Sequence, residues 1–382
     1  MASIASRPRA LGRRRGAALA VVLIALVVTA GLATGAVFAA RQARRSARDE
    51  LAQLRASAGA EGALVSALHP WDRRRAQLAS GGVDTTMLGA IAGATATVRA
   101  LRLDAERFLV EASARARASQ PGVGAWAERT ASVVVRLHRA TPAALGAVTA
   151  ASAVELLDGA TVDGRDAPPS GWSDCPASAN DSVAIAAASI TDVHVARGAS
   201  VSGAVAQSAV AADARTYDTF GAERWADLAR RADVAIDAAI DSSARTPRPR
   251  AAAGRCVLDA DAWGDPVHDA SGVAECATTY ALVVVRGNLT VRGPARGQGV
   301  LLVDGDLTLD GDLTFAGVVI VRGGVRAQRG ALHLDGALLV AAPTSLGSGT
   351  EVHRSRCALA RALDGIAPVA PIGRRAWAEV TR

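Results

Sequence analysis

The sequence contains no lysine: its 43 basic residues are all arginine, and 36 acidic residues leave a net charge of +7. A basic chain invites a nucleic-acid-binding interpretation. Here the arginines are spread along the whole chain, and no binding motif with interleaved aromatic residues accompanies them. This one-sided usage is typical of a compositional bias toward Arg, Ala and Gly. We therefore expect no nucleic-acid partner.

Aromatic residues are also scarce, at 3% of the chain, although 50% of its residues are hydrophobic. Small apolar side chains such as Ala, Gly and Val suit a thin, repetitive core better than a large globular one. The sequence lacks the G-x-S-x-G, P-loop and H-E-x-x-H motifs of hydrolases, nucleotide-binding proteins and zinc proteases. We expect a protein that is not an enzyme and holds no cofactor or metal.

The longest apolar run extends from Gly16 to Ala40 without a charged residue, and arginines flank it on both sides. At about 1.5 Å per residue, a helix of this length can cross a bilayer core of roughly 30 Å. A cleaved secretory signal is the main alternative, but its apolar core is usually only about 7–15 residues long. We expect a retained single-pass membrane anchor, with the N-terminus in the cytoplasm and the main domain exported.

The sequence beyond the anchor first continues as a helix and then changes to strands. We expect a basic leader over 1–16 and one transmembrane and stem helix over 17–69, because the residue before Pro70 is disfavoured in helices. From Phe108 to Ala116, apolar residues alternate with other residues, which is typical of a strand. We interpret 70–150 as a small mixed α/β region.

From residue 151 onward the chain is repetitive, and Gly287, Gly305 and Gly323 follow one another at equal intervals. Short strands with glycine corners at a regular period predict a parallel β-helix or β-solenoid over 151–365. A β-meander is the alternative, although tight hairpin turns do not produce so long a period. Helical spacing of Trp225, Leu228 and their neighbours predicts a helical insertion over 215–242, and 366–382 is expected to be a tail. The predicted fold class is mixed α+β.

The four cysteines, Cys175, Cys256, Cys276 and Cys357, all follow the anchor, and none belongs to a C-x-x-C pair. This spacing argues against zinc and thioredoxin-type sites. An even number of cysteines beyond a membrane anchor favours disulfides in an oxidising compartment. Three pairings are possible. We favour Cys256 with Cys276, which closes a short loop, and Cys175 with Cys357, which ties the ends of the outer domain; four unpaired cysteines are the alternative.

The segment from Arg15 to Leu23 (RGAALAVVL) resembles the start of PilX-type minor pilins of the type IV pilus system. It is also similar to the K-type minor pseudopilin of type II secretion. Four later segments resemble the extracellular part of large proteins with a PilX N-terminal domain: 169–175, 263–266, 297–307 and 355–363. The resemblance covers the anchor and most of 150–365, and it is weak between 70 and 150.

The resemblance implies a pilin-like transmembrane helix and the function of a minor pilin or pilus assembly component. The implied partners are the membrane, other pilin subunits and prepilin peptidase, which would cleave between Gly16 and Ala17. Major pilins carry glutamate at the fifth mature position, whereas Val21 stands there in this chain. The absence of this glutamate implies an accessory, initiator or tip subunit. It also leaves open whether prepilin peptidase cleaves this chain.

Two other functions stay open. The first is a membrane-tethered β-solenoid scaffold or adhesin that never enters a pilus. The second is an envelope polysaccharide-active β-helix enzyme, with Asp310, Asp335 and Glu351 as candidate carboxylates. Asp304, Asp306, Asp310 and Asp312 also suggest Ca²⁺ ligands, but aspartate beside glycine is equally typical of exposed turns.

Overall fold

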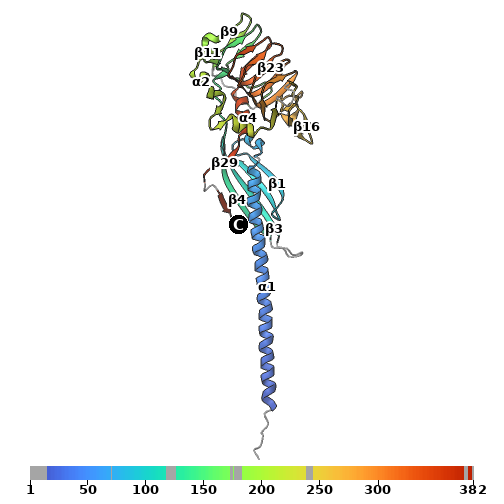
Figure 1. Cartoon of the computed structure of the whole chain (residues 1–382). Helices are drawn as coiled ribbons and strands as arrows, with labels where there is room; N and C mark the ends of the chain where they lie inside the picture. Colours follow the sequence, from blue (N-terminus) through green and yellow to red (C-terminus); the bar gives the residue numbers. More distant parts are fainter. Residues whose placement is uncertain are drawn as a thin grey trace, which may run out of the picture.

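The computed structural model describes residues 15–69, 71–117, 126–172, 175, 183–237, 244–373 and 377–380. Over these residues the fold is mixed α+β, with one long N-terminal helix followed mostly by strands. Figure 1 shows the helix as a rod whose upper part lies against an antiparallel sheet, with a body of parallel strands beyond that sheet.

The rod is helix α1 (Arg15–Leu68), a continuous helix of 54 residues. It ends directly before His69, as the proline at position 70 predicts. The side chains from Leu19 to Leu51 are exposed, whereas Ala56, Ala60 and Leu64 are fully buried against the sheet. The apolar run and the amphipathic run of the sequence therefore form two parts of a single helix.

The sheet beside α1 is an antiparallel meander. It contains β1 (Val83–Ile91), β2 (Ala94–Arg102), β3 (Arg107–Arg117) and β4 (Trp126–Leu137), preceded by the short helix η1 (Arg73–Gln77). Along β3 every second residue is buried, so Phe108 and Val110 face α1 as the alternation predicts. The expectation of a tail over 366–382 is wrong: β29 (Val369–Pro371) and β30 (Trp377–Val380) extend this sheet by pairing with β4. Val369 is buried in its core, which explains the pairing.

The parallel strands form a 13-stranded and a 7-stranded sheet. The longer sheet contains β5 (Gly146–Ala150), β7 (Thr161–Asp163), β8 (Val183–Ala187), β10 (Ser200–Ser202), β11 (Ala204–Gln207), β14 (Val234–Asp237), β18 (Leu258–Asp259), β19 (Ala262–Trp263), β20 (Ala281–Arg286), β22 (Ala295–Val303), β24 (Leu313–Val321), β26 (Leu332–Val340) and β28 (Glu351–Arg354). The other contains β6 (Val154–Leu156), β9 (Val193–Val195), β15 (Ala244–Arg245), β21 (Leu289–Val291), β23 (Leu307–Leu309), β25 (Val325–Ala327) and β27 (Thr344–Leu346).

Successive turns of the chain lie in register in this stack. Leu301 of β22 pairs with Val319 of β24, which pairs with Leu338 of β26. All these pairings are parallel, so the antiparallel meander is wrong for this region. The side chains between the two sheets are almost all Leu, Val, Ile and Ala, which gives the thin aliphatic core expected from the scarcity of aromatic residues.

The spatial order of the stack differs from the sequence order. β26 pairs with β5, and β5 pairs with β8, so residues 146–207 form one end of the stack. The chain then returns and starts the opposite end at β14, which pairs with β20. The parallel part thus begins at Gly146, a little before the expected boundary at 151.

The helical insertion expected over 215–242 is wrong for most of its length; residues 238–242 lie outside the described part. The chain there forms α2 (Ala209–Ala212), η3 (Ala214–Tyr217), β12 (Thr219–Phe220), β13 (Glu223–Arg224) and α3 (Trp225–Arg230) before β14. Phe220 of β12 is buried together with Trp225 and Leu228, which both lie on the short helix α3, so the predicted helical spacing holds only within α3. Val234 and Ile236 belong to β14 and enter the aliphatic core of the stack instead.

Helix α4 (Arg356–Ile366) packs on the outer side of β22 and β24 and joins the stack to β29. The remaining short elements of the described chain are η2 (Ile190–Asp192), β16 (Ala251–Ala252), β17 (Arg255–Cys256) and η4 (Ala274–Cys276). The hairpin of β16 and β17 and the hairpin of β18 and β19 lie at the β14 end of the stack.

Candidate membrane and assembly surface

The first part of α1 presents a continuous apolar surface. Every large hydrophobic residue from Leu19 to Phe38 is exposed, and Phe38 keeps 72% of its surface accessible. Apolar surface in water costs roughly 25 cal/mol per Å², so this length of helix requires an apolar environment. By length and composition, α1 is also the helix of the described chain that is able to cross a membrane.

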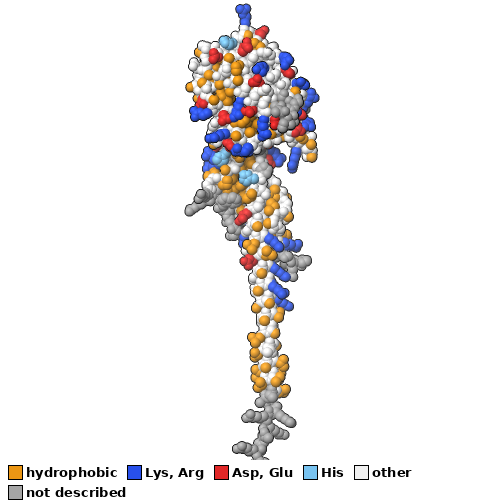
Figure 2. Space-filling view, viewed as in Figure 1, with side chains coloured by type: hydrophobic (Ala, Val, Ile, Leu, Met, Phe, Trp, Pro, Cys, Tyr) orange, Lys and Arg blue, Asp and Glu red, His pale blue; other side chains and the backbone are white. Residues whose placement is uncertain are grey.

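The few polar groups in this part of α1 are satisfied within the helix. The Thr29 hydroxyl donates to the carbonyl oxygen of Ala25 at 2.8 Å, and the Thr34 hydroxyl donates to that of Ala30 at 2.7 Å. Such bonds remove the cost of placing a hydroxyl in hydrocarbon. Figure 2 shows the apolar section followed by basic side chains nearer the sheet, where Arg41 begins the charged part of the helix.

The residues of the expected cleavage site lie at the beginning of α1. Gly16 and Ala17 belong to its first turn. Val21 is exposed, and no acidic residue precedes Asp49 in the sequence. The apolar surface of α1 therefore carries no carboxylate for a charge pair with the N-terminal amine of a neighbouring subunit.

The second part of α1 is fixed to the sheet by close packing and by one ion-pair cluster. Trp71, just beyond the helix, contacts Phe108 edge to face at a ring distance of 5.3 Å. The guanidinium of Arg75 lies over Trp71 and pairs with Asp84 at 2.8 Å. These contacts fix the orientation of the helix relative to the sheet. The sheet therefore has a fixed position relative to the exposed apolar part of α1.

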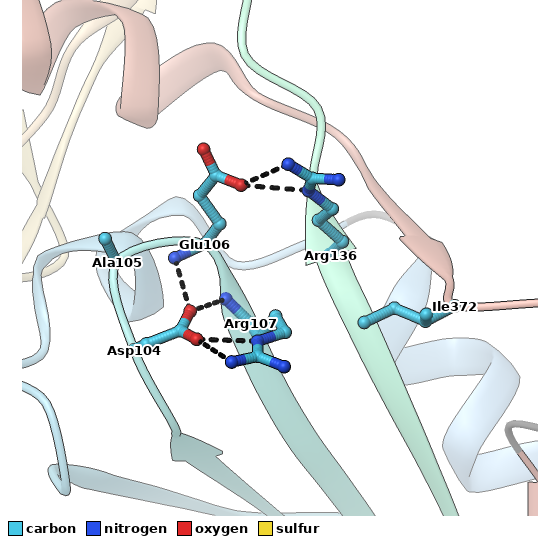
Figure 3. Close-up of a pocket in the computed structure, with 6 residues that line it drawn as sticks. All are labelled: Asp104, Ala105, Glu106, Arg107, Arg136 and Ile372. Carbon is cyan, nitrogen blue, oxygen red and sulfur yellow. Dashed lines mark hydrogen bonds and ion pairs between the residues drawn. The ribbon is translucent and has the colours of Figure 1, made fainter.

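A hollow of 530 Å³ lies beside the turn between β2 and β3 and is drawn in Figure 3. Its charged side chains are all paired: Arg136 donates to Glu106 at 2.6 Å, and Arg107 donates to Asp104 at 2.6 Å. Backbone N–H donation from Glu106, together with Arg107, lowers the pKa of Asp104 to about 2. Arg139 connects Glu106 to Asp364 of α4. This arrangement joins the sheet to the parallel body and offers no unpaired base or nucleophile.

The aspartates suggested as Ca²⁺ ligands are occupied by the chain's own donors. Asp304 pairs with Arg322 at 2.7 Å, and Asp310 pairs with Arg329 at 2.7 Å. Asp306 accepts from the backbone of Gly324, and Asp312 accepts from that of Ala331. Among the residues that the structure describes, no group of three or more His, Cys, Asp or Glu side chains is placed to hold a metal ion. The aspartates therefore act here as turn and corner residues.

The three carboxylates considered for an enzyme do not form one site. Asp310 lies in the turn between β23 and β24, where it pairs with Arg329. Asp335 and Glu351 lie on the neighbouring strands β26 and β28. Glu351 contacts His333 at 3.6 Å and His353 at 3.7 Å, and burial raises the pKa of Asp335. Sequence analysis did not find this histidine–carboxylate cluster, although Asp335 and His353 are separated by the same interval as the repeated glycines.

The structure contains two disulfides and, among the described residues, no free cysteine. Cys175 is bonded to Cys357, across 182 residues, and Cys256 is bonded to Cys276, across 20 residues. These are the two pairs favoured from the sequence. The first joins the loop after β7 to the start of α4, and the second joins the β16–β17 hairpin to η4.

No family model matches the chain, and no curated protein matches it. Among the solved structures that match, the competence-associated pilin ComZ from Thermus thermophilus aligns with 86% of this chain and 97% of its own at 10% identity. The TM-score of that alignment is 0.24, which does not establish a shared fold.

Proposed function

We propose that this protein is a minor pilin or type IV pilus assembly component of the PilX N-terminal-domain type, and that it is not an enzyme. The observation that carries the proposal is the division of α1 into an exposed apolar part and a part packed on an antiparallel sheet. One apolar surface of this kind suits two environments, the lipid bilayer before assembly and the helices of neighbouring subunits afterwards. The three carboxylates considered for an enzyme do not form one site, which supports a non-enzymatic role.

The proposed topology places the N-terminus in the cytoplasm, α1 across the inner membrane, and all strands on the exported side. Two disulfides support an exported location, because such bonds persist in oxidising compartments. We interpret the parallel stack as a short β-solenoid, since turns of nearly equal length pair in register from β22 to β26. It would be displayed away from the membrane, where other subunits are accessible.

The proposed processing is cleavage by prepilin peptidase between Gly16 and Ala17. The new N-terminus would lie at the start of α1, with Val21 at the fifth position. A repeating shaft subunit uses a carboxylate there, so we propose an initiating, tip or accessory position in the filament. The same valine favours the second candidate, a membrane-tethered scaffold or adhesin outside any pilus.

The test is the mature N-terminus, measured by mass spectrometry on protein from native membranes and from sheared surface fractions. A methylated Ala17 in both fractions is the expected result. A start at Met1 or Ala2, with no protein in the sheared fraction, would favour the tethered scaffold. A start beyond Ala40 would identify a secretory signal and contradict both candidates.

A matched pair of variants sharpens this test. Gly16→Arg should block cleavage and keep the protein in the membrane fraction, because the peptidase implied by the resemblance cuts after a glycine. Gly31→Ala, on the same helix with nothing within 4 Å of the added methyl group, should be processed normally. Equal processing of the two variants would contradict a cut after Gly16.

A further inference from the structure

The net positive charge of the chain is concentrated near its N-terminal end. Nine of the 43 arginines precede residue 49, and no acidic residue occurs before that position. The rest of the sequence carries 34 basic and 36 acidic residues, so it is nearly neutral. Four of the nine arginines directly follow the apolar run that ends at Ala40. The positive charge therefore belongs to the two flanks of the apolar run and not to the exported body.

The four arginines after the apolar run form an exposed stripe on α1. Arg41, Arg44, Arg45 and Arg48 are three or four residues apart, so they lie on one face of the helix. All four are exposed, and none forms an ion pair or a side-chain hydrogen bond with another described residue. Arg99 of the sheet, in contrast, is paired with a carboxylate at 2.9 Å. Figure 2 shows basic side chains gathered along one side of α1 just below the sheet. The cationic groups of this arginine stripe are thus available to an anionic partner outside the chain.

The arginine stripe lies where the apolar environment of α1 must end. The run from Gly16 to Ala40 is about 37 Å long at 1.5 Å per residue, and the hydrocarbon core of a bilayer is roughly 30 Å thick. A bilayer core around this run would therefore end close to Ala40. The headgroup layer adds about 5 to 8 Å on each side, and the stripe extends over about 10 Å of helix. The stripe would thus cover the headgroup layer. This step rests on the proposed position of α1 across a membrane and not on its entry into a pilus.

The end of the sheet nearest to the arginine stripe also has the side chains of a membrane interface. Trp126 at the start of β4 is 59% exposed, and the guanidinium of Arg117 lies 5.3 Å from the centre of its ring. Trp126 lines a hollow of 230 Å³ together with Asp49 and Gln53 of α1, which follow the stripe directly. Tryptophan is enriched at membrane–water interfaces, because its ring is apolar and its N–H group is polar. A second element therefore brings tryptophan and arginine to the level of the stripe.

We propose that the arginine stripe binds the phosphate groups of anionic phospholipids in the leaflet nearest the sheet. Guanidinium groups bind phosphate through paired, charge-assisted hydrogen bonds. A lipid headgroup is favoured over an acidic protein segment, because a lipid surface lies at this level wherever α1 crosses a bilayer. Arg117 and Trp126 reach the same layer from the sheet. The bound lipids fix the depth of the anchor, and the sheet, whose contact with α1 begins at Ala52, is held close to the headgroups.

The test measures which lipids the full chain binds in a phosphatidylcholine bilayer. A small amount of spin-labelled phosphatidylglycerol or phosphatidylcholine is added, and electron paramagnetic resonance separates lipid at the protein surface from free lipid. One arginine beside an anionic lipid strengthens binding by a factor of about five. Phosphatidylglycerol should therefore be preferred over phosphatidylcholine by about fivefold. The preference should shrink in about 1 M salt, where charges are screened beyond about 3 Å.

Two charge-matched variants locate the preference. The stripe variant carries glutamine, which keeps a high helix propensity, in place of all four arginines: Arg41→Gln, Arg44→Gln, Arg45→Gln and Arg48→Gln. It should lose at least about half of the preference. The control variant changes four exposed arginines of the parallel body and should keep the whole preference: Arg197→Gln, Arg255→Gln, Arg286→Gln and Arg292→Gln. The arginines of residues 1–16 are present in both variants, so their own lipid contacts do not affect the comparison.

The outcomes separate this inference from the proposed anchor. If the unmodified chain does not enter the bilayer at all, the position of α1 across a membrane is wrong, and the inference is wrong with it. If the chain enters but shows no preference for phosphatidylglycerol, the anchor stands and the inference alone is overturned. Equal preferences in the stripe and control variants would overturn it too. The stripe would then face an acidic surface of a neighbouring subunit instead of lipid.

Discussion

A Cβ atom on Gly336 would lie 1.8 Å from the carbonyl oxygen of Gly317. The two glycines pair across β24 and β26, and their φ angles are +149° and +131°. Gly299 continues the column on β22 with φ of +121°. Glycine is required at all three positions of this column, because only glycine combines such φ angles with so close an approach of neighbouring backbones.

Gly336→Ala should lower the free energy of unfolding by about 2 to 4 kcal/mol, since the methyl group adds both a clash and an unfavourable φ. Denaturant unfolding of the full chain in detergent measures the effect. Gly89→Ala is the control, because Gly89 has open space around the added atom, and it should change stability by less than about 0.5 kcal/mol. Equal losses of unfolding free energy in the two variants would show that the close approach and the φ angle at Gly336 do not determine the cost of adding a methyl group.

The regular period of the stack was visible in the sequence, but the spatial order of the turns was not. The equal intervals between Gly287, Gly305 and Gly323 indicate that successive turns stack in register. They cannot show that β5 packs on β26, because each turn exposes similar aliphatic residues and accepts any other turn as a neighbour. The order is set by where the chain crosses back between residues 208 and 233, which has no repeat.

The candidate surface on α1 was more predictable than the contacts around it. The uncharged run from Gly16 to Ala40 is a property of consecutive residues and needs no tertiary information. The pairing of β29 with β4 joins segments from opposite halves of the chain, and nothing near Val369 indicates that partner. Likewise, the helical spacing around Trp225 is real only within the short helix α3. The pattern extends to Phe220 and Ile236, which belong to the strands β12 and β14, and a single-segment pattern cannot show where the helix ends.

Gly59 should be essential for docking α1 on the sheet. A Cβ atom there would lie 2.7 Å from the Cβ of Ala94 and 3.1 Å from that of Ala114. Alanine gains up to about 1 kcal/mol of helix propensity over glycine, yet the overlap with two strands should outweigh it by about 1 to 3 kcal/mol. Thermal unfolding should therefore begin earlier in Gly59→Ala. Gly35→Ala, which meets nothing within 4 Å, should not lower the unfolding temperature.

The two disulfides should differ in their contribution to stability. Cross-links act largely by restricting the unfolded chain, and the separations of 182 and 20 residues predict about 2 kcal/mol more for Cys175–Cys357 than for Cys256–Cys276. Replacing both cysteines of each pair by serine and comparing denaturant midpoints measures this difference. Non-reducing peptide mapping should recover these two pairs from the unmodified protein; four free thiols, or crossed pairs, would contradict the assignment.

Asp335 should make the stability of the parallel body depend on pH. Burial raises its pKa in the folded chain, with His353 and His333 opposing the shift and Glu351 adding to it. A carboxyl group with a raised folded-state pKa holds its proton to higher pH when folded than when unfolded. Stability therefore falls as the pH rises from the ordinary carboxyl pKa, about 3.9, through the folded-state pKa, and the loss stays complete above it.

Asp335→Asn removes this loss, so the variant should be more stable than the unmodified protein at pH 7 and show a smaller advantage as the pH falls below the ordinary carboxyl pKa. Denaturant unfolding of both proteins, from pH 7 to below the ordinary carboxyl pKa, measures how the free energy of unfolding of each protein depends on pH. Asp304→Asn is the control. Asp304 is paired with Arg322, so this variant should be less stable than the unmodified protein at pH 7, or equally stable. An Asp335→Asn variant that is less stable at pH 7 would mean that the ionised carboxylate is held by its histidine neighbours, and that their attraction outweighs the cost of its burial.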